Sequence, residues 1–183
     1  MIRYFGTVLL MLVILCGPAS TGSDHIPTPQ QEFKSLISKC YNSYYEKNTH
    51  HEADIPLALV LGISIHESAW GKSRFSKEGY NYFGLRTTAK DKKHYMTPKG
   101  APNVKVAKFE DRCGSVHFFI NLISTDERYS ELFNFIKESG DYVDYEKALT
   151  FMNVYYEDPT WPKKVLNIIS CLLYTSPSPR DRI

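Results

Sequence analysis

The chain has 183 residues, of which 43% are hydrophobic and 14% aromatic, and its formal net charge is +2. This composition predicts one domain with a full hydrophobic core, and the length is too small for two. A nucleic-acid-binding protein would gather its basic residues into a patch, whereas these lysines are scattered along the sequence and the net charge is small. We therefore exclude a nucleic-acid partner.

The first 22 residues, MIRYFGTVLLMLVILCGPASTG, combine a basic Arg3, an apolar run at 4–16 and small residues at 17–22. This pattern is typical of a secretory signal peptide, because the apolar run is shorter than the ~20 residues of a membrane-spanning helix. A retained membrane anchor is the alternative. We expect an exported protein, secreted or periplasmic, that is not stably inserted in the membrane after cleavage.

Export affects the cysteines, because thiols oxidise outside the cytosol. Removal of the signal peptide leaves Cys40, Cys113 and Cys171, and no two of them have the CxxC spacing of a zinc or redox site. We expect either buried thiols or one disulfide, with Cys40 and Cys113 as the first choice of pair.

Both ends of the remaining chain differ in composition from its middle. Residues 23–31 are polar, contain two prolines and are predicted to form a linker. Residues 171–183, CLLYTSPSPRDRI, leave the helical pattern and resemble the translation of an adapter used in DNA library preparation. We treat them as a tail without function. The predicted domain spans residues 32–170.

The domain is predicted to be mainly α (α+β). Apolar residues recur at helical spacing over 33–45, 116–123, 129–136, 144–152 and again after Pro159. The segment 57–65 is apolar on nearly all sides, which predicts a central buried helix with Asp54 as its N-cap and close packing at Gly62. Residues 86–109 lose the helical pattern and alternate at their end, which predicts a small β-lobe.

Glu67 lies at the end of the predicted central helix, just before Trp70 and Gly71. The negative end of a helix dipole and apolar neighbours both favour the protonated form of a carboxyl group. A protonated carboxyl is what a general acid needs to protonate the leaving oxygen of a glycosidic bond. The ordinary alternative is a solvated glutamate at a helix end, and the flanking residues decide between the two.

Those flanking residues carry a specific motif. HESAWGKSRF at 66–75, followed by NYFGL at 81–85, resembles the ES-x-WG-x-S…N-x-FG signature of the glucosaminidase family of bacterial peptidoglycan hydrolases, glycoside hydrolase family 73. The similarity extends over roughly 55–169 and includes YYEDPTW at 155–161, where Trp161 replaces the family's last tyrosine. The resemblance implies a lysozyme-like helical domain that cleaves the β-1,4 bond after N-acetylglucosamine in the glycan strands of peptidoglycan.

The resemblance also implies roles for individual residues. Glu67 is then the catalytic acid, and Tyr155 is the nearby tyrosine that orients a water or the acetamido group of the sugar. Trp70 and Phe83 are expected to line the cleft, although both also fit a role in the core. Asn81 and Tyr156 lie in the same motifs and complete the predicted substrate-binding set.

The second carboxylate is where the sequence departs from the family pattern. Many members place a glutamate in the β-lobe to activate water, whereas here only Asp91, Glu110 and Asp111 are candidates. We favour Glu110, because it follows the alternating strand. An inverting enzyme needs two carboxyls ~6.5 to 9.5 Å apart and a retaining one ~5 Å apart. Attack by the substrate's own N-acetyl group would need no second carboxylate.

Parts of the sequence also match other functions. His66 and Glu67 match the start of the zinc motif HExxH, but Trp70 occupies the place of the second histidine, so we predict no metal and no cofactor. Lys72, Arg74 and Arg86 either meet carboxylates of peptidoglycan stem peptides or form a solvated rim. A lytic transglycosylase and a non-catalytic wall-binding scaffold remain as alternatives. We expect a monomer.

Overall fold

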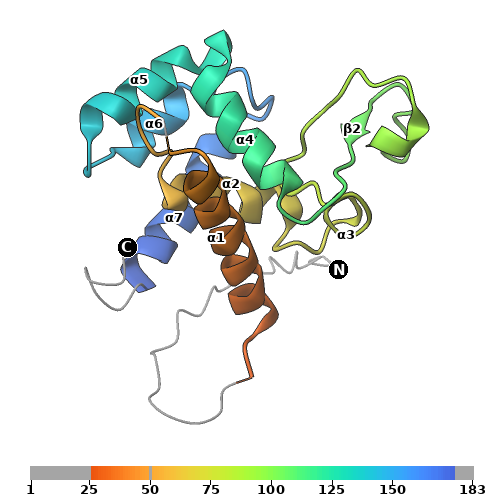
Figure 1. The fold of residues 1–183 in the computed structure, drawn as a ribbon, viewed down its shortest axis with the longest axis horizontal. Coiled ribbons are helices and arrows are strands. Elements are labelled where there is room, and N and C mark those ends of the chain that lie inside the picture. Colours follow the sequence, from red (N-terminus) through yellow and green to blue (C-terminus); the bar gives the residue numbers. More distant parts are fainter. Residues whose placement is uncertain (1–25, 50, 176–183) are drawn as a thin grey trace, which may run out of the picture.

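The computed structural model describes residues 26–49 and 51–175, and helices dominate it (Figure 1). In chain order the helices are α1 (Pro29–Lys47), α2 (Leu57–Ser68), α3 (Arg74–Gly79), η1 (Lys92–His94), α4 (Gly114–Thr125), η2 (Glu127–Tyr129), α5 (Ser130–Ser139), α6 (Tyr145–Thr150) and α7 (Trp161–Thr175), where η marks a short 3-10 helix. The predicted signal peptide at 1–22 lies outside the described residues. Within those residues, no helix combines the length and apolar character needed to cross a membrane.

A small β-lobe, residues 86–108, separates α3 from α4. Its strand β1 (Tyr95–Met96) pairs antiparallel with β2 (Val106–Ala107), with Tyr95 opposite Ala107. In Figure 1 this lobe extends to the right of the helices. The prediction of a mainly α domain with one small β-lobe after the central helix is confirmed.

Helix α2 is the centre of the fold. Eight of its 12 residues are buried, as expected for a helix that is apolar on nearly all sides. A Cβ atom added at Gly62 would lie 2.5 Å from Cγ1 of Ile169 in α7, so the predicted close packing at this glycine is confirmed. The predicted N-cap is wrong: Pro56 occupies that position, and the Asp54 carboxylate pairs with His51 instead.

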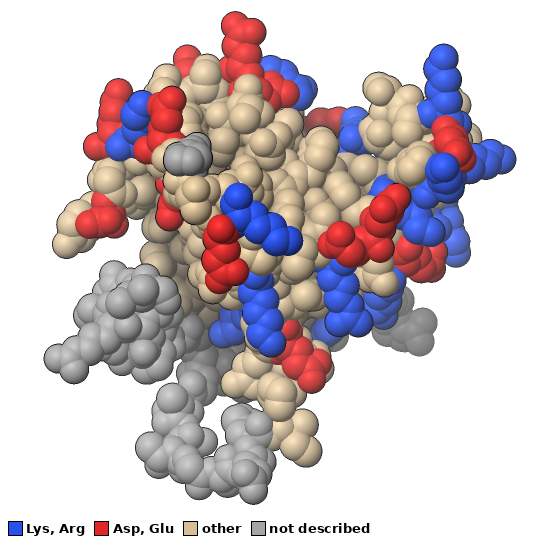
Figure 2. Space-filling view, in the orientation of Figure 1, with Lys and Arg blue, Asp and Glu red and all other residues tan. Residues whose placement is uncertain are grey.

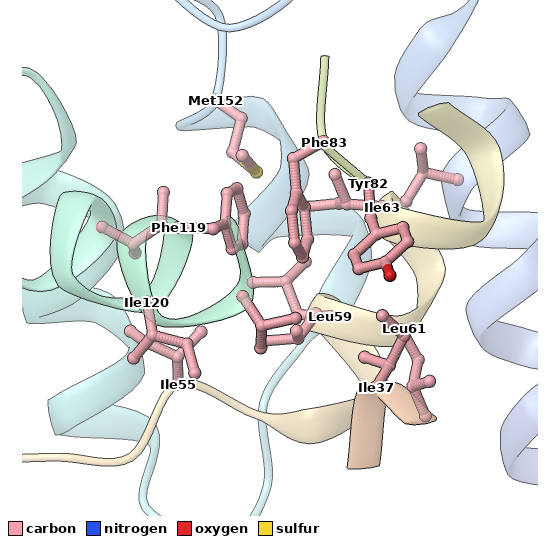
Figure 3. Close-up of a cluster of buried hydrophobic side chains, with 14 of the residues drawn as sticks. Ile37, Ile55, Leu59, Leu61, Ile63, Tyr82, Phe83, Phe119, Ile120 and Met152 are labelled. Carbon is pink, nitrogen blue, oxygen red and sulfur yellow. The ribbon is translucent and has the colours of Figure 1, made fainter. Parts of the chain in front are cut away.

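The hydrophobic core joins α2 to α4 and to the segment after α3. The rings of Phe83 and Phe119 stack with their centroids 4.3 Å apart and 5° between their planes, and Leu59, Ile63 and Met152 surround them (Figure 3). All five side chains are fully buried. Burial of each such side chain contributes about 1.5–3 kcal/mol, so this cluster holds the helices around the end of α2 in place.

The outer helices overlap the predicted linker and tail. Helix α1 begins at Pro29, where the side chains of Thr28 and Gln31 form a reciprocal capping box, so residues 29–31 belong to the domain. Helix α7 continues to Thr175, and Leu172 packs against the core. The folded part therefore extends past both predicted boundaries, at residues 31 and 171.

A disulfide joins α1 to the start of α4. Cys40 and Cys113 are 73 residues apart in sequence, and their Cα atoms lie 5.0 Å apart. The first choice of pair from the sequence is confirmed.

We expect this disulfide to contribute about 2–5 kcal/mol to the free energy of unfolding, because it restricts a long loop of the unfolded chain. Reduction should lower the denaturant concentration at the unfolding midpoint by a corresponding amount. A variant with both Cys40→Ser and Cys113→Ser should unfold at that lower concentration and show no response to the reductant. An unchanged midpoint after full reduction would contradict this expectation.

Candidate active site

Glu67 lies in the last turn of α2, and the chain reverses immediately after it. Ala69, Trp70 and Gly71 have φ angles of 51°, 61° and 70°, which is the left-handed region. This conformation costs about 1–2 kcal/mol for a residue with a Cβ. The buried Ser68 compensates, since its hydroxyl donates to the Ser64 carbonyl at 2.6 Å and accepts the Gly71 N–H at 2.8 Å. Helix α2 therefore ends with its glutamate at the terminus.

A second turn, residues 81–85, lies against this helix end and is built around Asn81. The amide nitrogen of Asn81 donates to the carbonyls of Leu85 and Ala107, both at 2.9 Å. Its amide oxygen accepts the N–H groups of Phe83 and Leu85. Asn81 is only 2% exposed. The prediction that its side chain binds substrate is therefore corrected: it holds the turn and ties it to strand β2.

This turn places Gly84 beside the Glu67 carboxyl group. Gly84 is exposed and has a φ angle of +64°, and a Cβ added there would lie 3.2 Å from Oε2 of Glu67. The backbone conformation favours glycine, and any larger side chain would press on this carboxyl oxygen. The small size of glycine leaves Oε2 of the half-buried Glu67 open toward the surface.

The other carboxyl oxygen is held by α7. The indole Nε1–H of Trp161 donates to Oε1 of Glu67 at 2.6 Å. The ring of Tyr156 stacks on Trp161 at 4.9 Å between centroids, and His66 meets it edge-on at 6.1 Å. Sequence reasoning placed Tyr156 in the site but did not include Trp161. Its position at the end of YYEDPTW was the only signal for it.

Asp158 fixes the first turn of α7, and with it Trp161. Its carboxylate accepts from the N–H and hydroxyl of Thr160 and from Lys164 Nζ at 2.7 Å, and its carbonyl accepts the Trp161 N–H at 2.9 Å. The hydrogen bonds from Lys164 and Thr160 hold the pKa of Asp158 well below its ordinary value. The carboxylate is therefore charged at neutral pH, as a helix N-terminus favours.

Tyr155 approaches Glu67 from the loop that precedes α7. Burial raises the pKa of Tyr155 well above its usual value, and the nearby Glu67 carboxylate raises it further. The hydroxyl therefore keeps its proton and donates a hydrogen bond to the Phe83 carbonyl. The Phe83 side chain is 1% exposed and stacks in the core. The prediction that Phe83 lines the cleft is corrected, since only its backbone takes part in the site.

Two other predicted residues lie in separate pockets. Trp70 lines a pocket of about 380 Å³ together with Phe33 of α1, and Glu67 is not among its lining residues. Glu110 is exposed and lines a second pocket, of about 410 Å³, together with Lys93 and His94, again without Glu67. The structure does not bring Trp70 or Glu110 into the group around Glu67.

The remaining acidic candidates of the β-lobe region have local partners. Asp91 accepts the Lys93 N–H at 3.1 Å, and Asp111 accepts the N–H groups of Cys113 and Gly114 at 2.7 and 2.9 Å. Over residues 26–49 and 51–175, no group of three or more His, Cys, Asp or Glu side chains is arranged to hold a metal ion. The described site thus offers one carboxyl group, with one oxygen held and the other open, which suits transfer of a single proton.

Comparison with known proteins assigns the chain to a family. The sequence model of the Glucosaminidase family, described as mannosyl-glycoprotein endo-beta-N-acetylglucosaminidase, matches residues 42–173. A comparison with curated protein sequences gave no significant match.

Three solved structures share the fold. The catalytic domain of the autolysin Auto from Listeria monocytogenes is 20% identical, with a TM-score of 0.60 over 82% of this chain and 88% of its own. A glycoside hydrolase domain of FlgJ from Salmonella typhimurium is 18% identical, with a TM-score of 0.55 over 80% and 99%. A peptidoglycan hydrolase from Sphingomonas sp. A1 is 15% identical, with a TM-score of 0.56 over 79% and 96%.

Proposed function

The chain belongs to the Glucosaminidase family, and on that premise we propose that it is an exported hydrolase of peptidoglycan with Glu67 as its general acid. It is a glycoside hydrolase by family membership. The proposed reaction is cleavage of the β-1,4 bond that follows N-acetylglucosamine. The structural relatives from Listeria and Sphingomonas, an autolysin and a peptidoglycan hydrolase, support the bacterial wall as the substrate.

The observation that carries the proposal is the unequal environment of the two Glu67 oxygens. An indole N–H can donate a hydrogen bond but cannot accept one. With Oε1 occupied by the Trp161 donor, the acid proton of Glu67 belongs on Oε2, beside Gly84. That oxygen faces the open side of the site. A leaving glycosidic oxygen placed over Gly84 would receive the proton directly.

The aromatic residues around Glu67 suit the sugar side of the reaction. The Tyr155 hydroxyl donates its hydrogen bond to the Phe83 carbonyl, so its oxygen can accept a hydrogen bond from a water or from the acetamido N–H of the substrate. Tyr156 is partly exposed and stacks on Trp161, which gives the sugar ring an apolar face beside the acid. We assign the substrate contacts to these two tyrosines.

The position of Glu110 gives no support to a second catalytic carboxylate. Attack on the sugar carbon by the acetamido oxygen of the substrate itself requires no second carboxylate, whereas direct attack by a water would need one to activate it. The Cys40–Cys113 disulfide supports export, since disulfides persist in oxidising compartments such as the periplasm and the extracellular space.

The deciding experiment is product analysis after digestion of purified peptidoglycan. Hydrolysis is expected to release fragments with N-acetylglucosamine at the reducing end. Fragments ending in anhydro-muramic acid would instead identify a lytic transglycosylase, which shares the need for one glutamate. An active-site-intact protein that releases no fragments but binds the polymer would be a wall-binding scaffold, and the hydrolase proposal would then be wrong.

A substitution at Gly84 tests whether Oε2 is the working oxygen. Gly84→Ala should lower the rate of peptidoglycan clearing about 10- to 100-fold, because the new methyl group lies against Oε2 and shifts the acid from its working position. The free energy of unfolding should fall by only about 1–2 kcal/mol. The control is Gly100→Ala, which carries the same left-handed strain, at φ +80°, with no atom within 4 Å of the new Cβ. Equal clearing rates in the two variants would contradict the assignment.

A further inference from the structure

The β-lobe concentrates the positive charge of the protein. Residues 86–108 contain seven Lys and Arg residues and one acidic residue, Asp91, in a chain whose formal net charge is only +2. The rest of the chain is therefore net acidic. This one segment of the sequence forms the projecting lobe, and blue side chains predominate along its outer margin (Figure 2).

Most of these charges face solvent without a partner that would neutralise them. Lys90, Lys92 and Lys99 are exposed, and no ion pair within residues 26–49 and 51–175 involves them. Lys93 and Arg86 differ, because they lie 3.4 Å from the carboxylates of Asp91 and Glu157, respectively. Like charges grouped in this way repel one another, and an anionic ligand would relieve that repulsion.

The lobe is also fixed relative to the candidate acid. It begins two residues after Gly84, and Arg86 forms a bridge with Val106 in strand β2. The Asn81 amide donates both to the Gly84-bearing turn, at Leu85, and to Ala107 of the same strand. A polymer strand with one bond over Oε2 of Glu67 therefore has the basic lobe beside its neighbouring units.

We propose that the β-lobe is a docking surface for the carboxylate groups of the stem peptides that peptidoglycan strands carry. This inference rests on the proposed function, which supplies the polymer. The carboxylates are spaced along the strand. Separate exposed lysines can therefore bind several of them, whereas a single tight pocket could bind only one. Each contact is exposed, so the attraction should be modest, additive over several lysines and screened by salt.

The test uses full-length protein that carries Glu67→Gln, so that the polymer stays intact during the measurement. A triple variant, Lys90→Gln, Lys92→Gln and Lys99→Gln, is compared with a control triple in α1, Lys34→Gln, Lys39→Gln and Lys47→Gln. Both triples remove the same charge. In co-sedimentation with purified peptidoglycan at low salt, the lobe triple should bind about three- to thirty-fold more weakly than its parent, and the α1 triple should not.

Two further probes identify the source of the anionic groups. Peptidoglycan whose carboxylates are blocked by carbodiimide coupling to a neutral amine should bind the parent and the lobe triple equally, and addition of 0.5 M NaCl should remove the difference on intact peptidoglycan. Equal binding of both triples to intact peptidoglycan would overturn the proposal. So would a loss by the lobe triple that persists on the carboxylate-blocked polymer or is confined to anionic phospholipid vesicles.

Failure of the docking-surface proposal can be distinguished from failure of the proposed hydrolase function. Co-sedimentation reads binding by a protein that cannot turn over, whereas product analysis reads cleavage by the Glu67 protein. Normal cleavage together with equal binding by both triples would reject the docking surface alone. A binding loss specific to the lobe triple, without release of fragments by the wild type, would reject the hydrolase and keep the surface.

Discussion

Replacement of Glu67 by glutamine is expected to abolish clearing of peptidoglycan while the fold and the binding of the polymer persist. Glutamine has the same shape, and its amide oxygen can still accept the hydrogen bond from Trp161 Nε1. It has no acid proton to give to the leaving oxygen. General acid catalysis typically contributes about 10²- to 10⁴-fold, so a loss of kcat of that size is expected in a turbidity assay. The thermal unfolding midpoint should stay within a few degrees of the wild type.

Glu110→Gln is the matched control, since the same chemical change is made at an exposed carboxylate in a separate pocket. We expect it to retain near wild-type clearing. A loss as large as that of Glu67→Gln would restore Glu110 as a second catalytic carboxylate. Full clearing by Glu67→Gln would show that another group donates the proton.

The parts of the fold that could be predicted are those that depend on residues close together in the sequence. The segment 57–65 is apolar on all sides and must be buried, whatever surrounds it. Gly62 in such a helix indicates a close neighbour, which is Ile169. Glu67 could be singled out because its whole motif lies within a few residues of the helix end. The Cys40–Cys113 pair was the first choice among few cysteines.

What could not be predicted depends on contacts between distant segments. Trp161 lies 94 residues after Glu67, and their hydrogen bond exists only because α7 packs along α2. Asn81 and Phe83 belong to the motif, yet they serve the turn and the core, and only the position of α4 and β2 reveals this. A motif thus identifies the residues that build a site without saying which of them face the ligand.

The start of α2 shows the same limit at a smaller scale. Asp54 has the chemistry of an N-cap, but Pro56 already has the extended backbone of that position, and His51 offers the Asp54 carboxylate another partner.

Replacement of Trp161 by phenylalanine is expected to lower kcat about 10- to 100-fold with little change in KM. The substitution removes the only donor to Oε1 of Glu67 seen among the described residues and keeps an aromatic ring for Tyr156 to stack on. A hydrogen bond to a charged group is worth about 1.5–3 kcal/mol, which corresponds to that range of rate. Without the donor, the acid proton is no longer directed to Oε2. Initial rates on soluble glycan fragments would measure the two constants separately.

A purely structural role for Trp161 predicts a different set of results. Its ring is 4% exposed, so the phenylalanine variant could lose activity through loose packing alone. Trp161→Tyr separates the two explanations, because it restores a hydrogen-bond donor on the ring while leaving a cavity similar to that of the phenylalanine variant. Recovery of turnover without recovery of stability would assign the loss to the hydrogen bond.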